Sequence, residues 1–238
     1  MEIRELWRYP VKSMGGERLE EAELLPDGIR GDRLIQVVTN GQIVTARIRP
    51  QLLGFHAWLG DGDVPQVDGR RFDDPAVLAA VREATALPEA QLQTDDFVER
   101  FDVLPLTVLT DGGIEAFGYD HRRLRPNIVI SGVDGLAEKT WAGRMLKVGG
   151  GAAYIGIARS RTRCVMTTFD PDTLEADSGV LRRIVHSFGG QVALDCWVIE
   201  PGNVTEGDAV ELVEVPPAIE PPVGNGDDPF TWSRRQLG

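Results

Sequence analysis

The sequence predicts a mainly β protein of the α+β class, built as a barrel or a strongly curved sheet with a few peripheral helices. Short apolar runs recur along the chain, turn residues separate them, and few segments show helical periodicity. With 238 residues, of which 42% are hydrophobic, the chain can bury the core of one large domain, or of a small and a medium one.

The strand candidates begin at the N-terminus with EIRELWRYPV, which ends at Pro10. In RLIQVVTNGQIVTARI, two apolar runs are joined by Asn40-Gly41, the dipeptide typical of a two-residue hairpin. Further strands are predicted in RPNIVI, RMLKVGG, AAYIGIARS, RCVMTTF, QVALDCWVIE and AVELVE. The Gly- and Asp-rich segment 54–71 is predicted to be a loop.

Two helices have clear start signals. DDPAVLAAVREATAL offers Asp74 as N-cap and Pro75 in the first turn. SGVLRRIVHSFGG begins at Ser178, carries apolar residues at helical spacing and ends in two glycines. Both helices are expected to pack one face on the sheet.

Charge and cysteine content exclude several classes of partner and site. A net charge of -12 argues against duplex DNA or an anionic membrane as partner. Two cysteines form neither a secreted disulfide framework nor a paired-cysteine zinc motif. No signal-peptide pattern and no apolar run of about 20 residues is present. We therefore expect a cytoplasmic protein with free thiols and no nucleic-acid or membrane partner.

The turn after the first strand candidate, YPVKSMGG, carries Lys12 and Ser13. An ammonium, a hydroxyl and backbone amides near glycines suit a phosphate-like anion, and Arg33 precedes the next strand. The spacing is not that of a Walker motif. On these residues alone, a solvated turn is the favoured interpretation of the segment.

A donor pair, Arg125 and Asn127, stands at the head of RPNIVI. A guanidinium and an amide together can hold the carbonyl and amino edges of a planar heterocycle. Asn127 is also a common hydrogen-bonding residue at the entry of a strand, and the sequence leaves both interpretations open.

The segment SRTRCVMTTFDPDT places Cys164 among arginines. Arg159, Arg161 and Arg163 would favour the thiolate, the form that acts as a nucleophile or as a ligand of a soft metal. None of the three histidines lies in a cysteine-protease signature, and His186 is expected on a surface. Cys196, in LDCWVIE, is predicted to be a buried apolar residue.

These segments together resemble the MOSC-domain family, named after the C-terminal domain of molybdenum cofactor sulfurase. The resemblance rests on YPVKSMGGERL, GDR, TAR, RPNIVISG, Trp141 and SRTRCVMTTFDPDT in that order, and it extends from residue 2 to residue 214. In layout the chain is most similar to family members that reduce amidoximes and other N-hydroxylated compounds. The resemblance implies a MOSC N-terminal-like β-rich domain at 1–95, a barrel-like MOSC domain at 96–214 and a Pro/Gly-rich tail at 215–238.

The resemblance also implies a pterin-based molybdenum cofactor with Cys164 as the protein thiolate on the metal. Its phosphate would be held by Lys12, Ser13 and Arg33, and Arg47 from TAR would also face the pocket. The pterin would be lined by Arg125, Asn127, Thr162 and Arg163.

The implied activity is the reduction of N-hydroxylated or N-oxide compounds. A [2Fe–2S] cluster takes four ligands, whereas this chain has two cysteines, so electrons are expected from a separate ferredoxin or a flavin or iron–sulfur reductase. Two alternatives remain open: a sulfur or cofactor carrier that uses Cys164, and a β-rich binding module without catalysis.

Overall fold

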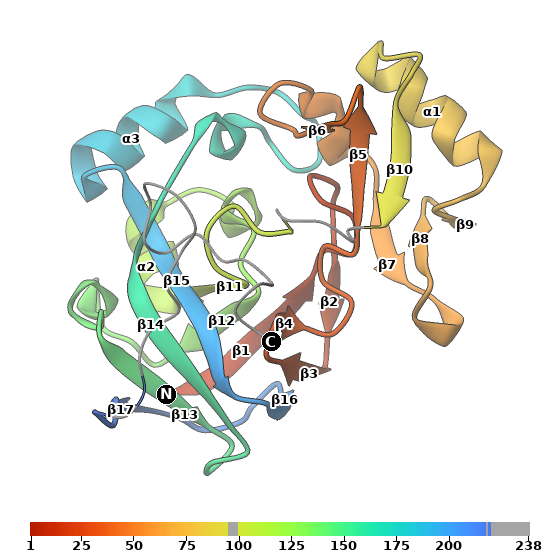
Figure 1. Ribbon diagram of the computed structural model, residues 1–238. Helices are drawn as coiled ribbons and strands as arrows, with labels where there is room; N and C mark the ends of the chain where they lie inside the picture. The colour runs from red at the N-terminus through yellow and green to blue at the C-terminus, as the bar shows by residue number, and fades with distance from the viewer. Residues whose placement is uncertain (95–99, 218, 220–238) are drawn as a thin grey trace.

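The computed structural model describes residues 1–94, 100–217 and 219, and within them the largest element is a mixed eight-stranded sheet (Figure 1). The predicted mainly β fold is confirmed. Along the sheet the strands follow the order β17 (Val210–Glu214), β13 (Arg144–Val148), β14 (Ala153–Thr162), β15 (Gln191–Glu200), β11 (Leu106–Thr110), β12 (Ile128–Ser131), β1 (Glu2–Arg8) and β2 (Glu17–Leu19).

This sheet curls until its β17 end meets the start of β1. Glu2, in β1, forms an antiparallel bridge with Ala209, next to β17, and Val210 N donates to Met1 O over 2.9 Å. Register shifts in the β14–β15 and β1–β12 pairs supply the curvature, because bulges bend strands and increase their twist. The apolar core inside includes Ile3, Leu6, Leu106, Leu146, Ile155 and Cys196.

A second core lies under three-stranded sheets of the N-terminal half. One sheet joins β10 (Gln91–Thr94), β5 (Ile35–Thr39) and β6 (Gln42–Val44), and another joins β7 (Ala57–Leu59), β8 (Pro65–Val67) and β9 (Arg70–Arg71). The short helix η1 (Pro50–Gly54) and α1 (Pro75–Thr85) also pack here. A third small sheet joins β16 (Gly202–Thr205), β3 (Glu21–Leu25) and β4 (Gly28–Ile29).

The hairpin between β5 and β6 forms as predicted. Asn40 and Gly41 adopt φ values of 49° and 74°, the left-handed pair that a type I′ turn requires. The loop prediction for segment 54–71 is wrong, because β7, β8, β9 and the single turn η2 (Asp61–Asp63) lie within it. Strands of two or three residues are too short to show an alternating pattern in the sequence.

Both predicted helices are present. Asp74 caps α1 by accepting from Ala76 N over 2.8 Å, and Asp177 caps α3 (Ser178–Phe188) by accepting from Gly179 N over 2.7 Å. α2 (Asp111–Phe117) was not predicted, since it begins with Gly112 and Gly113. With α3 it covers one face of the sheet through a third apolar cluster (Figure 1).

The predicted strand in RCVMTTF is wrong. Its residues form a 3-10 turn, η5 (Val165–Thr168), with Cys164 at the N-cap position, two residues after the end of β14. The Thr167 and Thr168 hydroxyls donate back to Cys164 O and Val165 O over 2.9 and 2.7 Å, which closes the turn locally. Cys164 therefore lies at the end of a strand instead of within one. Two further 3-10 turns are η3 (His121–Leu124) and η4 (Ala137–Thr140).

Segments from both halves of the chain share the large sheet. β1 and β2 come from the N-terminal region, yet β1 pairs with β12, and β3 pairs with β16. The expected division at residues 95/96 and most of the tail 215–238 lie outside the described residues, so the division stays a prediction. Within the part of the chain that is described, no helix is long and apolar enough to cross a membrane.

Candidate functional site

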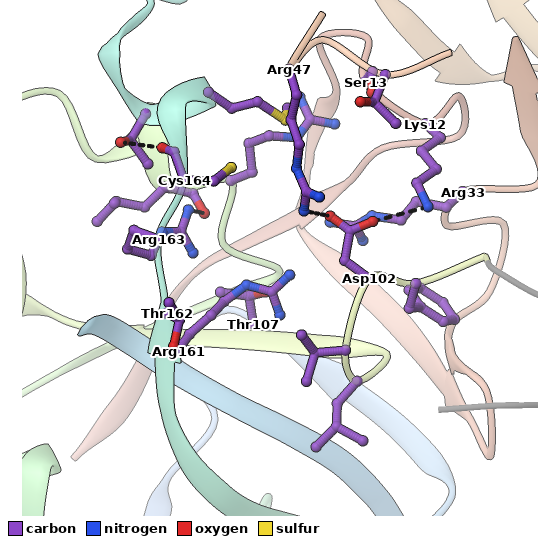
Figure 2. Close-up of a pocket in the computed structure, with 18 of the residues that line it drawn as sticks. Lys12, Ser13, Arg33, Arg47, Asp102, Thr107, Arg161, Thr162, Arg163 and Cys164 are labelled. Atoms are coloured by element: carbon purple, nitrogen blue, oxygen red, sulfur yellow. Dashed lines mark hydrogen bonds and ion pairs between the residues drawn. The ribbon is translucent and has the colours of Figure 1, made fainter. Parts of the chain in front are cut away.

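A cavity of about 100 Å³ opens beside Cys164, between the large sheet and the second core (Figure 2). The Cys164 side chain is half-buried and the thiol is free. Among the residues expected to bind a ligand, the cavity is lined by Lys12, Ser13, Arg33, Arg47, Arg125, Thr162, Arg163 and Cys164. Residues separated by 150 positions in the sequence are thus brought to one wall.

The Lys12-Ser13 turn is fixed by backbone bonds to β5. Lys12 N donates to Ile35 O over 2.7 Å, and Ser13 Oγ accepts from Ala46 N over 3.0 Å. Ser13, Arg33 and Arg125 all adopt left-handed φ values, of 71°, 52° and 51°. Such conformations in non-glycine residues cost about 1–3 kcal/mol each and concentrate at functional sites. The strain is held in place by the surrounding hydrogen bonds.

A fully buried carboxylate, Asp32, joins this turn to the rest of the site. Its Oδ1 accepts from Tyr9 N over 2.7 Å, and its Oδ2 accepts from Asn127 Nδ2 over 3.3 Å and pairs with Arg33 Nη1. A buried charge is tolerated when it is paired and hydrogen-bonded in this way. Asp32 therefore fixes where Arg33 and the start of the Lys12-Ser13 turn lie.

Asn127 is the expected ligand-binding residue that does not line the cavity. It is fully buried, its Oδ1 accepts from Thr107 N over 3.1 Å, and its Nδ2 is directed to Trp7 O and Asp32. The structure supports the interpretation of Asn127 as a hydrogen-bonding residue at the entry of a strand, because every polar atom of its amide already has a protein partner.

Asp102 forms a bridge across the cavity. Its carboxylate lies 3.0 Å from Lys12 Nζ and 2.7 Å from Arg47 Nη2, as the dashed lines in Figure 2 show. Burial opposes its charge, but Lys12 and then Arg47 lower the pKa of Asp102 to about 2. The same carboxylate is the main cause that raises the pKa of Arg47, with the Cys164 side chain contributing as well.

Two cations of the cavity have no carboxylate partner within 4.0 Å among the described residues: Arg125 and Arg163. Arg125 Nη1 donates to Met14 O and Arg163 Nη2 to Leu124 O, each over 2.6 Å. Arg125 Nη2 and Arg163 Nε and Nη1 are buried without a hydrogen-bond partner there. Burial lowers the pKa of Arg125 to about 10, and burial with the nearby Arg161 lowers that of Arg163 to about 9. The unpaired donors fit an anionic, oxygen-rich or nitrogen-rich ligand.

The other two arginines near Cys164 in sequence are occupied. Arg161 Nη1 pairs with the fully buried Asp195, and Arg159 Nε lies 3.6 Å from the same carboxylate. The Cys164 side chain is among the groups that raise the pKa of Arg47 and of Arg163, so these two arginines lie close to it. Cys196 is fully buried in the core of the large sheet as predicted, and burial raises the pKa of its thiol well above the ordinary value.

Sequence reasoning missed Asp32, Asp102 and Tyr9. Asp32 stands in the GDR segment, where only the arginine was considered, and a buried Asp beside an Arg was the available signal. Arg125 lies over the Tyr9 ring at 4.1 Å, and burial raises the pKa of the Tyr9 hydroxyl to about 12. Nothing local marks Asp102, whose partners are 90 and 55 positions away.

Comparison with known families identifies the chain. A model of the MOSC domain matches residues 76–211, more than half of the chain, and a model of the MOSC N-terminal beta barrel domain matches residues 1–97. The chain belongs to the MOSC family. The resemblance seen in the sequence is thereby confirmed, and the Cys164 cavity is lined by residues from both matched regions.

Curated relatives of this MOSC protein are known. It is similar to mitochondrial amidoxime-reducing component 1 of Mus musculus, with 27% identity over an alignment of 286 residues that covers 89% of this chain and 82% of the relative. The human protein of that name is 26% identical, with 72% and 67% covered. Among solved structures, the YUAD protein of Bacillus subtilis aligns with a TM-score of 0.47 and 12% identity, covering 90% of this chain and 96% of that one.

The Asp102 bridge predicts an acid-dependent stability. Its pKa is about 2 in the folded protein and ~3.9 in an unfolded chain, so its contribution is present above about pH 4 and is lost as pH falls toward 2. Asp102→Asn should lower the free energy of unfolding at pH 6 and should cost progressively less below pH 4. Urea unfolding across this pH range measures the difference. A difference that stays constant with pH would contradict the bridge; the exposed Asp61→Asn is the control.

The unpaired guanidinium of Arg163 predicts that the ligand-free protein is less stable than it could be. Arg163→Met should stabilise it by roughly 1–3 kcal/mol, because an apolar side chain of similar volume replaces a half-buried cation whose Nε and Nη1 are buried without partners. Thermal unfolding of protein prepared without cofactor measures this. Arg4→Met removes an exposed arginine and should change the stability by less than about 0.5 kcal/mol. A clear loss of stability in Arg163→Met would show that the cation is already compensated.

Proposed function

We propose that this MOSC protein binds a molybdenum cofactor through Cys164 and reduces N-hydroxylated or N-oxide compounds with electrons from a separate protein. The observation that carries the proposal is the juxtaposition of a free, half-buried thiol with buried guanidinium donors that lack partners. Its relatives named amidoxime-reducing components support the substrate class.

The cavity residues divide into two groups under this proposal. Lys12, Ser13 and Arg33 hold the phosphate of the cofactor, with Arg47 beside them, since ammonium and guanidinium groups give short charge-assisted bonds to phosphate oxygens. Arg125, Thr162 and Arg163 hold the pterin, whose polar edges accept from the unpaired donors. Asn127 does not line the cavity; through Asp32 it helps to hold Arg33, which belongs to the phosphate group.

Entry of such a ligand requires Asp102 to leave its two cations. The cavity measures about 100 Å³, whereas pockets for ligands of this size measure ~300–1,000 Å³. The Asp102 carboxylate lies between Lys12 and Arg47, where the proposal puts the phosphate. Lys12 and Arg47 then exchange one anion for another, which keeps both cations neutralised before and after binding.

Held by these residues, the molybdenum cofactor would supply two-electron redox chemistry for the reduction of the substrate. The net reaction consumes one N–OH group, two electrons and two protons, and yields N–H and water. The residues of this chain bind the cofactor and orient it. Electrons come from a ferredoxin or a flavin or iron–sulfur reductase, because Cys164 is assigned to the metal and Cys196 is fully buried.

Metal content and turnover test the proposal together. Protein expressed in a host that makes the cofactor should contain molybdenum near one atom per chain and should reduce benzamidoxime with an artificial electron donor. Cys164→Ser should lower turnover by at least ~100-fold, since even changes to residues around a metal ligand cost 10–100-fold. Cys196→Ala, which removes the other thiol, should keep both metal and turnover.

Other outcomes exclude the proposal. Metal-free protein from that host with labile sulfur on Cys164 would identify a sulfur carrier. Molybdenum content without turnover of any N-hydroxylated compound would leave a cofactor carrier. Turnover by Cys164→Ser equal to that of the unmodified protein would remove Cys164 from the site.

A further inference from the structure

A second cavity, of about 330 Å³, lies next to the Cys164 cavity. Its volume is in the range of small-molecule sites. The residues that line it come from the start of the chain, from η1 and the residues after it, from η3 and from the segment after η5. They are Trp7, Tyr9, Gly15, Gly16, Leu53, Gly54, Phe55, His56, Arg122, Arg123, Arg125, Met166, Phe169, Pro171 and Asp172.

The walls of this cavity are predominantly aromatic and apolar. Trp7, Phe55 and Phe169 are half-buried, so part of each ring remains available to a ligand. Gly16 keeps the cavity open beside Tyr9, because a Cβ at this position would collide with the Tyr9 ring and the Arg8 carbonyl. Rings from three separate segments suit a flat aromatic ligand, since aromatic pairs stack or meet edge to face.

The second cavity shares a wall with the first. Arg123, Arg125 and Met166 line both. Met166 lies in η5, two residues after Cys164, and its flexible thioether can adapt to the shape of a ligand. A molecule in the second cavity therefore has its inner end beside the Cys164 cavity.

The charges around the second cavity are largely neutralised. Arg122 pairs with Asp120 and Asp172, each over 2.6 Å, and Arg123 pairs with Asp170 over 2.8 Å. Arg123 Nε and Arg125 Nη2 are buried without partners among the described residues, and the exposed His56 ring adds one further polar group to the wall. This composition favours a neutral ring with one polar group at its inner end, and it offers too few free polar atoms for the edges of a pterin.

We propose that the second cavity binds the aromatic part of the substrate, so that the protein prefers N-hydroxylated compounds whose polar group is attached to a flat ring. The N–OH group then reaches past Met166 toward Cys164, within reach of the Arg125 donor. This inference rests on the proposed function and gives its substrate class.

The test compares benzamidoxime with acetamidoxime, which carries the same reactive group without the ring. Binding is measured by calorimetry on cofactor-loaded protein without an electron donor, and turnover is measured separately with the donor. Benzamidoxime should bind at least about tenfold more tightly than acetamidoxime. Phe55→Leu and Phe169→Leu should each weaken the binding of benzamidoxime, raising its Kd and its KM about threefold to tenfold with kcat little changed.

Acetamidoxime provides the matched comparison for each phenylalanine variant. Neither variant should change the Kd or the KM of acetamidoxime. Tyr154→Leu alters a half-buried aromatic residue that lines neither cavity, so it should leave the affinity for both compounds unchanged. Thermal unfolding verifies that each variant is folded, and the second phenylalanine variant keeps the test valid if one is not.

Failure of this inference is distinguishable from failure of the proposed function. Turnover of both compounds with equal affinities, or with affinities unchanged by both phenylalanine variants, overturns the aromatic site and leaves the reductase. Ring-dependent binding that the variants weaken, in protein that shows no turnover, supports the aromatic site and removes the reductase.

Discussion

The buried carboxylate of Asp32 is the interaction on which the rest of the site depends. It accepts from Tyr9 N at the start of the Lys12-Ser13 turn, pairs with Arg33 and holds Asn127, which in turn supports the head of β12. Leaving any of these groups unpaired in the interior would cost several kcal/mol, so the arrangement holds as a unit. The wall of the Cys164 cavity that carries Arg33 and the Lys12-Ser13 turn is therefore fixed before any ligand arrives.

That preorganisation is unfavourable for the protein alone. Ser13, Arg33 and Arg125 hold left-handed backbone. Arg125 and Arg163 are half-buried cations with buried donor atoms and without a carboxylate partner in the described residues. Strain and uncompensated charge of this kind persist when the surrounding fold is stable enough to impose them. Here the closed sheet and the second core flank the cavity on either side, and an anionic ligand relieves the charge.

Some features of the fold and of the site could be predicted from the sequence, and others could not. The Asn40-Gly41 hairpin, the caps of α1 and α3 and the buried Cys196 follow from local rules, and the structure confirms them. The turn η5 depends on two threonine hydroxyls that bond backward, so the β-branched run around Cys164 was misread as a strand. Lys12, Arg33 and Arg163 line one cavity, and the cofactor-binding roles that the family resemblance implies for them stay predictions. Asp102 and the role of Asn127 depend on long-range ion pairs and hydrogen bonds, which a single sequence does not reveal.

The central claim is that Cys164 supplies a thiolate to molybdenum in a cofactor held by the surrounding cations. Molybdenum X-ray absorption on the loaded protein tests it most directly, because the fitted number of sulfur neighbours counts the protein thiolate together with the two dithiolene sulfurs. The account predicts that Cys164→Ser loses one sulfur neighbour relative to the unmodified protein and that Cys196→Ala loses none. An identical sulfur count in the unmodified and Cys164→Ser proteins would contradict it.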